Sequence, residues 1–271
     1  MGRVVHTLPE GGIVVGVTVL AGEIYVLRPK ERDQVEVYDV ITYRFQRFIT
    51  VANSRIFTDM TSCEHYLCVY IADHGAECVH RLDASGCATQ WAVHGKPSGL
   101  SVNTAHNVLV TYRNVRRIKV FSSHGEVLHN VTFSDDLINL WHAIQLTSGQ
   151  FIVCHSDHNN AIHHVCMISP DGRHIDRLQG GQRGSDTGQY NEPRHLAVDN
   201  DEFVFVADSA NRRVTLLSQS LSHVRQVLSR DKIKGGPERL CLDVHSRRLY
   251  VADNDSDGKR RRTGRVVVFS V

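Results

Sequence analysis

Residues 203–214 read FVFVADSANRRV, and residues 249–253 read LYVAD before the chain resumes with RVVVFS at 265–270. Each copy consists of an apolar run, an Ala-Asp end, a polar turn and a second apolar run. Short runs rich in Val and Phe that are bounded by polar turn residues predict β-strands. The two copies therefore predict a repeated pair of antiparallel strands.

The same pattern recurs along the whole chain. The last apolar residue of the first run recurs at intervals of 39 to 53 residues, at Val26, Ile71, Val110, Val153, Val206 and Val251. Around Val206, HLAVD (195–199) precedes the pair and HVRQVL (223–228) follows it, which makes four strands. Four strands per unit and a period of about 45 residues are typical of a β-propeller blade. We therefore predict an all-β, six-bladed β-propeller of four-stranded antiparallel blades, forming a single domain over residues 1–271.

The two ends of the chain are predicted to close the ring. The last unit reaches Val271 after only three strands. Residues 2–8 read GRVVHTL and are similar to fourth strands such as GEVLHNV at 125–131. We expect residues 2–8 to form the fourth strand of the last blade, which would remove an open sheet edge.

The aspartate that ends the first run is also repeated. Asp208 has counterparts in Asp73 and Asp253. We expect Asp208 to accept hydrogen bonds from nearby backbone donors, Asn211 to adopt the tight turn and Arg213 to begin the return strand. Recurrence at one repeat position favours a structural role for these aspartates over a catalytic one.

Composition points to a packed protein in a reducing compartment. Of the 271 residues 41% are hydrophobic and 22% charged, and the net charge is +2. The seven cysteines show no regular disulfide spacing, so we expect reduced thiols and a cytoplasmic location. No apolar run is long enough to span a membrane, and no membrane partner or cofactor is expected.

One stretch carries a family resemblance. GSDTGQYNEPRHLAVDNDEFVFVADSANRRVTLL (184–217) has a Gly-rich approach, Asn-Glu-Pro, a strand and VADSANRRV. It resembles the NHL repeat, and the chain is similar to the six-bladed NHL domains that end animal tripartite-motif proteins. Three blades depart from the pattern, with Leu27, Thr111 and Cys154 in place of the Ala. The resemblance implies a non-catalytic platform for RNA or protein, which in that family is part of a larger multidomain chain.

One face of the predicted propeller is basic. Loops from the second to the third strand, and from the fourth strand to the next blade, lie on the same face, here called the top face. Such loops include YRNVRR (112–117) and DNDSDGKRRRTGR (253–265), which suit RNA phosphates or an acidic protein segment. The few aromatic candidates for base stacking are Tyr112, Tyr190 and Trp141. The predicted ligand-binding residues are Tyr112, Arg113, Arg116, Trp141, Arg194, His195, Arg212, Arg239, Lys259, Arg260, Arg261 and Arg262.

The channel mouth suggests an alternative function. The first strand of each blade should line the channel, and His142 and His195 occupy the same repeat position in adjacent blades. Their rings should approach one another, and with Glu238 nearby they could hold zinc. Some six-bladed relatives are metal-dependent lyases, so the alternative is a metal-dependent lyase or hydrolase. The preferred prediction is a monomeric, non-catalytic propeller without a metal that binds a protein segment or RNA.

Overall fold

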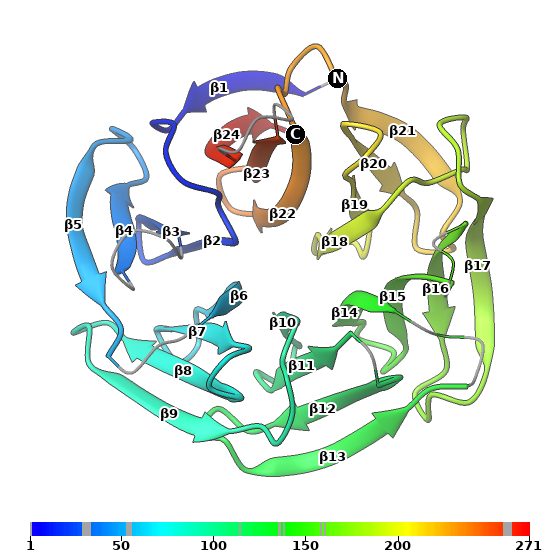
Figure 1. The fold of residues 1–271 in the computed structure, drawn as a ribbon, viewed down its shortest axis with the longest axis horizontal. Coiled ribbons are helices and arrows are strands. Elements are labelled where there is room, and N and C mark those ends of the chain that lie inside the picture. The colour runs from blue at the N-terminus through cyan, green and yellow to red at the C-terminus, as the bar shows by residue number, and fades with distance from the viewer. Residues whose placement is uncertain are drawn as a thin grey trace.

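Six four-stranded antiparallel sheets are arranged in a ring around a central axis (Figure 1). This computed structural model describes residues 2–28, 34–52, 56–113, 115–134, 137, 139–157, 159, 161–256 and 262–271. The predicted all-β, six-bladed propeller is confirmed. Within these ranges there is no helix of the length and apolarity needed to cross a membrane.

Each blade runs from an innermost strand near this axis to an outermost strand at the rim. Blade one comprises β2 (Gly16–Leu20), β3 (Glu23–Leu27), β4 (Gln34–Asp39) and β5 (Phe45–Thr50). Blade two comprises β6 (Phe57–Cys63), β7 (Cys68–Asp73), β8 (Cys78–Asp83) and β9 (Ala88–Ala92). Blade three comprises β10 (Gly99–Val102), β11 (Val108–Tyr112), β12 (Arg117–Phe121) and β13 (Val127–Thr132).

The remaining blades follow the same order. Blade four comprises β14 (Leu140–Gln145), β15 (Phe151–Ser156), β16 (Ile162–Ile168) and β17 (Ile175–Gln182). Blade five comprises β18 (Pro193–Val198), β19 (Val204–Asp208), β20 (Arg213–Leu217) and β21 (His223–Leu228). Blade six comprises β22 (Gly236–Asp243), β23 (Arg248–Ser256), β24 (Arg262–Ser270) and the N-terminal strand β1 (Arg3–Thr7).

Strand β1 closes the ring as predicted. It pairs antiparallel with β24, from Arg3 opposite Ser270 to Thr7 opposite Val267. The pairing continues one residue further, where the Leu8 backbone N–H donates to the Val266 carbonyl at 2.8 Å. The last blade is therefore built from both ends of the chain.

The hydrophobic core consists of six clusters, one between each pair of neighbouring blades. The cluster between blades six and one combines Tyr250 and Val266 with Val17 and Ile24. Leu8, just after the closing strand, is buried in this same cluster. Closure therefore rests on apolar burial as well as on the strand ladder.

Leu8 offers a test of this closure. We expect Leu8→Ala to lower the free energy of unfolding by about 2–3 kcal/mol, because it removes a buried side chain and leaves a cavity. Val4→Ala, in the preceding strand β1 and 38% exposed, is the matched control and should cost less than about 1 kcal/mol. Denaturant unfolding of both variants checks the prediction, and equal losses would contradict it.

The repeated aspartates hold the top-face turns, also as predicted. In blade five, Asp208 accepts a hydrogen bond from the Asn191 backbone N–H at 2.7 Å and pairs with Arg213 Nε at 2.7 Å. Arg213 begins β20, which confirms its predicted place. Asn211 lies in the turn, and the left-handed residue of this turn is its neighbour Arg212, with φ of 53°. Asn211 donates its side-chain amide to Asp208.

Blades six and two repeat the arrangement. Asp253 accepts from the Gly235 backbone N–H at 2.8 Å and pairs with Arg265 Nε at 2.9 Å. Asp73 accepts from the Ile56 backbone N–H at 3.0 Å. Each aspartate thus ties the end of a second strand to the chain that enters the same blade, which fixes the top-face loops around the mouth.

Candidate functional site

Four innermost strands carry a β-bulge at the same point near the top face. The register shifts between Phe57 and Asp59 in β6, and at the equivalent points of β14, β18 and β22. A bulge adds one residue to a strand and re-aims its side chain. The added residues line a cavity of about 430 Å³ at the mouth, and they are Thr58, Trp141, Arg194 and Glu238. The residues that follow them form a second layer, here called the inner layer, of Asp59, His142, His195 and Arg239.

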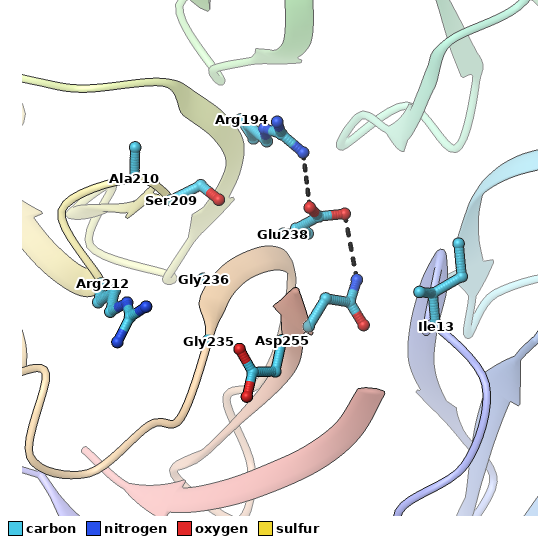
Figure 2. A pocket seen from close by; sticks show the side chains of 10 residues that line it. Ile13, Arg194, Ser209, Ala210, Arg212, Gly235, Gly236, Glu238 and Asp255 are labelled. Atoms are coloured by element: carbon cyan, nitrogen blue, oxygen red, sulfur yellow. Dashed lines mark hydrogen bonds and ion pairs between the residues drawn. The ribbon is translucent and has the colours of Figure 1, made fainter. Parts of the chain in front are cut away.

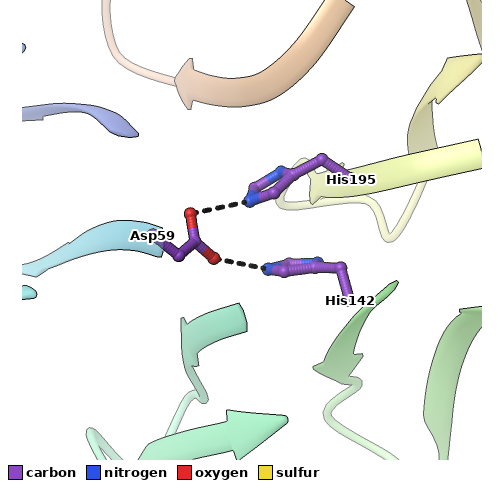
Figure 3. Close-up of side chains that lie close together, drawn as sticks. All are labelled: Asp59, His142 and His195. Carbon is purple, nitrogen blue, oxygen red and sulfur yellow. Dashed lines mark ion pairs between the residues drawn. The ribbon is translucent and has the colours of Figure 1, made fainter. Parts of the chain in front are cut away.

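Three members of the inner layer converge on one point (Figure 3). His142 and His195 stack with ring centroids 3.7 Å apart, so their predicted approach is confirmed. Their Nε2 atoms lie 3.9 Å and 3.5 Å from the two carboxylate oxygens of Asp59. All three side chains are buried. The acidic partner of the histidines is thus Asp59, and not Glu238 as the sequence had suggested.

Glu238 belongs to the mouth. Its Oε1 lies 2.6 Å from Arg194 Nη1, and its Oε2 accepts a hydrogen bond from Asn254 Nδ2 at 3.1 Å (Figure 2). Both carboxylate oxygens are therefore engaged away from the two histidines.

Arg239 supplies the positive charge of the inner layer. Its Nε lies 3.0 Å from Asp59 Oδ1. Its Nη1 donates to the Glu238 carbonyl at 2.7 Å, and its Nη2 donates to the Thr58 carbonyl at 2.5 Å. Arg239 comes from blade six and Thr58 and Asp59 from blade two, so the contacts of Arg239 with these two residues connect blades that are not neighbours.

The hydrogen bonds assign the tautomer of both histidines. His142 Nε2 lies 2.9 Å from the Leu100 carbonyl, which can only accept, so this nitrogen carries the proton. His195 Nδ1 accepts from the Leu240 backbone N–H at 3.4 Å, which places the proton of the neutral ring on Nε2, facing Asp59. A metal needs a free nitrogen lone pair. Coordination at either Nε2 would have to displace its proton, which on His142 is hydrogen-bonded to the Leu100 carbonyl.

The inner layer holds one negative and one positive charge. Burial lowers the pKa of His142 to about 3, and the neighbouring His195 lowers it further in the same direction. Burial also lowers the pKa of His195. Burial has the largest single influence and would raise the pKa of Asp59, but the Arg239 guanidinium, His195 and His142 together hold that pKa well below its usual range. At neutral pH, Asp59 and Arg239 are therefore the ionised pair and both imidazoles are neutral.

Arg113 and Trp141 form the most distinctive feature of the top face. The Arg113 guanidinium lies 3.6 Å from the Trp141 ring centroid, and the Arg194 guanidinium lies 5.1 Å from it. Arg113 is exposed and lines both the mouth cavity and a neighbouring cavity of about 400 Å³. Within the described part of the chain it forms no ion pair with a carboxylate. Burial of part of its surface, and then the charge of Arg194, lower its pKa.

The neighbouring cavity is strongly basic. Lys119 lies at its edge and donates from Nζ to the carbonyls of Val93 and His94, at 2.6 Å and 3.2 Å. Among the described residues no acid lines this cavity, whose walls are His74, His94, Gly95, Lys96, Tyr112, Arg113, Val115, Arg117 and Lys119. It is therefore a ready site for anionic groups.

The other predicted ligand-binding arginines differ in their availability. Arg194 is neutralised by Glu192 and Glu238, each at 2.6 Å. Arg212 is exposed and lines a third cavity of about 240 Å³ between blades five and six (Figure 2). Arg116 is half-buried in the turn before β12. Counting the basic residues of the top-face loops therefore overestimates how many of their charges are available to a ligand.

The predicted stacking aromatics are not presented to a ligand. Tyr112 is buried, and its hydroxyl donates to the Val93 carbonyl at 2.8 Å. Tyr190 is also buried. Trp141 is partly buried, and Arg113 lies over its ring.

The densest basic run, Lys259–Arg262, lies almost entirely outside the described residues. Lys259, Arg260 and Arg261 lie outside the described residues. Arg262 is the first residue of β24, but its side chain is not described.

Sequence reasoning missed Asp59. Blade two lacks the proline that marks the start of β18 and β22, so its innermost strand was not aligned with theirs. A signal was present, because Asp59 precedes Asp73 by the same 14 residues that separate Arg239 from Asp253. Counting back from the repeated aspartate would have placed Asp59 in the inner layer.

Comparison with known proteins establishes the fold only. No protein-family model matches the chain, and no curated protein matches it in sequence. Many solved structures share the architecture. A protein of unknown function from Bacteroides thetaiotaomicron covers 99% of this chain, over 72% of its own, at 15% identity and a TM-score of 0.70.

Two lyase structures are also similar. Virginiamycin B lyase from Staphylococcus aureus covers 90% of this chain, over 81% of its own, at 11% identity and a TM-score of 0.61. A streptogramin B lyase covers 100% of this chain, over 86% of its own, at 11% identity and a TM-score of 0.63. Identities this low carry the propeller architecture and no site residues.

Proposed function

We propose that this propeller is a non-catalytic binding platform whose top face binds an acidic protein segment at the channel mouth. The observation that carries the proposal is Arg113, which is exposed, stacked on Trp141 and lacking a carboxylate partner among the described residues. An arginine held over an aromatic ring is preorganised to meet a carboxylate with two parallel hydrogen bonds.

The surroundings of Arg113 extend the proposed binding surface. On one side lies the mouth cavity, and on the other the basic cavity with Lys96 and Arg117. Both cavities share Arg113 and His74, so one extended segment can occupy them together. Several carboxylates along that segment would meet cations from blades two and three.

The burial of the aromatic side chains favours a protein ligand over RNA. Sequence-specific RNA recognition needs aromatic faces on which bases stack. Tyr112 and Tyr190 are buried, and Trp141 is covered by Arg113. The resemblance of residues 184–217 to the NHL repeat supports a binding platform in general, since such domains bind protein or RNA.

The inner layer supports binding over metal-dependent catalysis. Asp59, His142 and His195 are nearly inaccessible, with at most 6% of any of them exposed. The two Nε2 protons face Asp59 and the Leu100 carbonyl, and Arg239 already provides a cation to the carboxylate. This layer is best explained as a buried, ion-paired floor beneath the mouth.

Charge reversal at Arg113 tests the proposal. The probes are a fluorescent oligo-glutamate peptide and a single-stranded RNA of equal net charge, both measured by anisotropy at low ionic strength. We expect the peptide to bind, and Arg113→Glu to weaken it about tenfold or more, because an attractive contact becomes repulsive. Arg173→Glu is the matched control, since Arg173 is 80% exposed in a bottom-face turn of blade four.

The outcomes separate the two ligand classes. If Arg113→Glu and Arg173→Glu weaken the peptide equally, the contact is non-specific and the proposal fails. If RNA binds more tightly than the peptide and loses affinity with Arg113→Glu, the same face is an RNA site.

A further inference from the structure

Blade two contains a second convergent cluster, at the end of β7 and the start of β8. Asp73, Cys78 and His80 are all buried, with exposures of 0%, 5% and 1%. His80 Nε2 lies 3.4 Å from Asp73 Oδ2 and 3.5 Å from Cys78 Sγ. The three potential ligand atoms all lie within 4.8 Å of one another. The strand ladder produces this convergence, because Asp73 is opposite Cys78 and His80 is on the same side of β8 as Cys78.

The repeat shows what is unusual about this cluster. In blades five and six the residue opposite the repeated aspartate is an arginine, Arg213 or Arg265, whose guanidinium pairs with the carboxylate. In blade two the residue opposite Asp73 is Cys78. The position that elsewhere supplies a cation therefore supplies a sulfur ligand, and an imidazole stands beside it.

The geometry differs from that of a catalytic cysteine. In a catalytic relay, one imidazole nitrogen faces the thiol and the other faces the carboxylate. Here the thiol of Cys78 and the carboxylate of Asp73 approach the same nitrogen, Nε2 of His80.

The distances fit a tetrahedral zinc ion. Zinc binds sulfur at about 2.3 Å, nitrogen at about 2.0 Å and carboxylate oxygen at about 2.1 Å. The edges of such a tetrahedron are about 3.5 Å from sulfur to nitrogen and about 3.4 Å from nitrogen to oxygen. The cluster shows 3.5 Å and 3.4 Å for these two pairs. We infer that Asp73, Cys78 and His80 bind a zinc ion.

The site has the character of a structural centre. Asp73 Oδ1 accepts hydrogen bonds from the backbone of Ile56, Gly75 and Ala76, so the carboxylate is held while Oδ2 faces His80. The fourth zinc position is left to water or to the neighbouring side chain of Gln90, whose Oε1 lies 4.0 Å from Cys78 Sγ. Burial leaves no room for a substrate, and binding would stabilise the top turn of blade two.

Metal titration of the chelator-treated full chain tests the inference. We expect one equivalent of Zn²⁺ to bind and to raise the Tm by about 5 °C at roughly hundredfold excess over Kd. Co²⁺ should bind in its place with a thiolate-to-cobalt charge-transfer band. Cys78→Ser and His80→Gln should abolish both effects. Cys87→Ser, at an exposed thiol of the same blade, should retain them.

A further variant exploits the repeat. Cys78→Arg installs the residue found in blades five and six, and should remove the zinc response while the metal-free protein keeps a Tm near that of the zinc-loaded wild type. A Co²⁺ complex without the thiolate band, or zinc stabilisation that survives Cys78→Ser, would overturn the inference and place the metal elsewhere. The absence of a zinc-dependent Tm shift in the wild-type protein would also overturn the inference, and this outcome can be observed without any variant.

Discussion

Replacing Asp59 with alanine is expected to lower the free energy of unfolding by about 3–5 kcal/mol. Removing one member of a buried ion pair leaves the other charge without its partner, and losses of this size are typical. Arg239 would keep its hydrogen bonds to the Thr58 and Glu238 carbonyls but lose its counter-charge. The Leu100 backbone N–H would lose its acceptor, Asp59 Oδ2, at 2.8 Å. Denaturant unfolding monitored by tryptophan fluorescence measures the loss.

A matched control and a second-site variant sharpen this test. Glu64→Ala removes a carboxylate from the same blade that is 68% exposed and should change stability by less than about 0.5 kcal/mol. Adding Arg239→Met to Asp59→Ala should recover part of the loss, because the stranded guanidinium is gone. A loss below about 1 kcal/mol for Asp59→Ala would show that the carbonyl bonds alone satisfy Arg239.

Acidification should destabilise the protein through the two stacked histidines. Burial lowers the pKa of His142 to about 3 in the folded chain, against about 6.5 when unfolded. The unfolded chain therefore binds the proton first as the pH falls. The stability associated with the neutral ring is complete above pH 6.5 and declines as the pH falls from there towards 3. The slope is about 1.4 kcal/mol per pH unit for one histidine.

The corresponding measurement compares unfolding at pH 7 and pH 5. Over that interval His142 alone should account for a loss of about 2 kcal/mol, and His195, whose pKa is lowered in the same direction, adds to it. His142→Gln should reduce the loss by that amount while its amide can still donate to the Leu100 carbonyl. His245→Gln, at an exposed residue, should leave the pH dependence unchanged. An unaltered pH dependence in His142→Gln would contradict the assignment.

The architecture was predictable because its signals are local and repeated. The alternation of apolar runs and turns around Asp73, Asp208 and Asp253 sets the strand pairs, and the incomplete last unit required a strand from the other end. The approach of His142 and His195 followed from their equal repeat positions. Each of these inferences used only the order of residues within a repeated unit.

The chemistry of the mouth was less predictable, because it depends on contacts between blades. A count of basic residues could not show that Arg194 is paired with Glu192 and Glu238 while Arg113 is stacked on Trp141. The Arg194–Glu238 and Arg113–Trp141 contacts join residues from different blades, whose relative rotation no periodic pattern specifies.

Because of the shared bulge, different residues of the same strands form the mouth and the layer beneath it. At each of four strands, the added residue lines the cavity and its successor belongs to the inner layer, and of these successors Arg239 also reaches the cavity. Exchanging Trp141 or Thr58 would alter what a visiting molecule meets, whereas His142 and Asp59 would continue to brace the ring. Neighbouring residues of these strands therefore have different tasks, one contacting a ligand and the next supporting the ring. A substitution at the first position can change ligand preference while the second still holds the blades together.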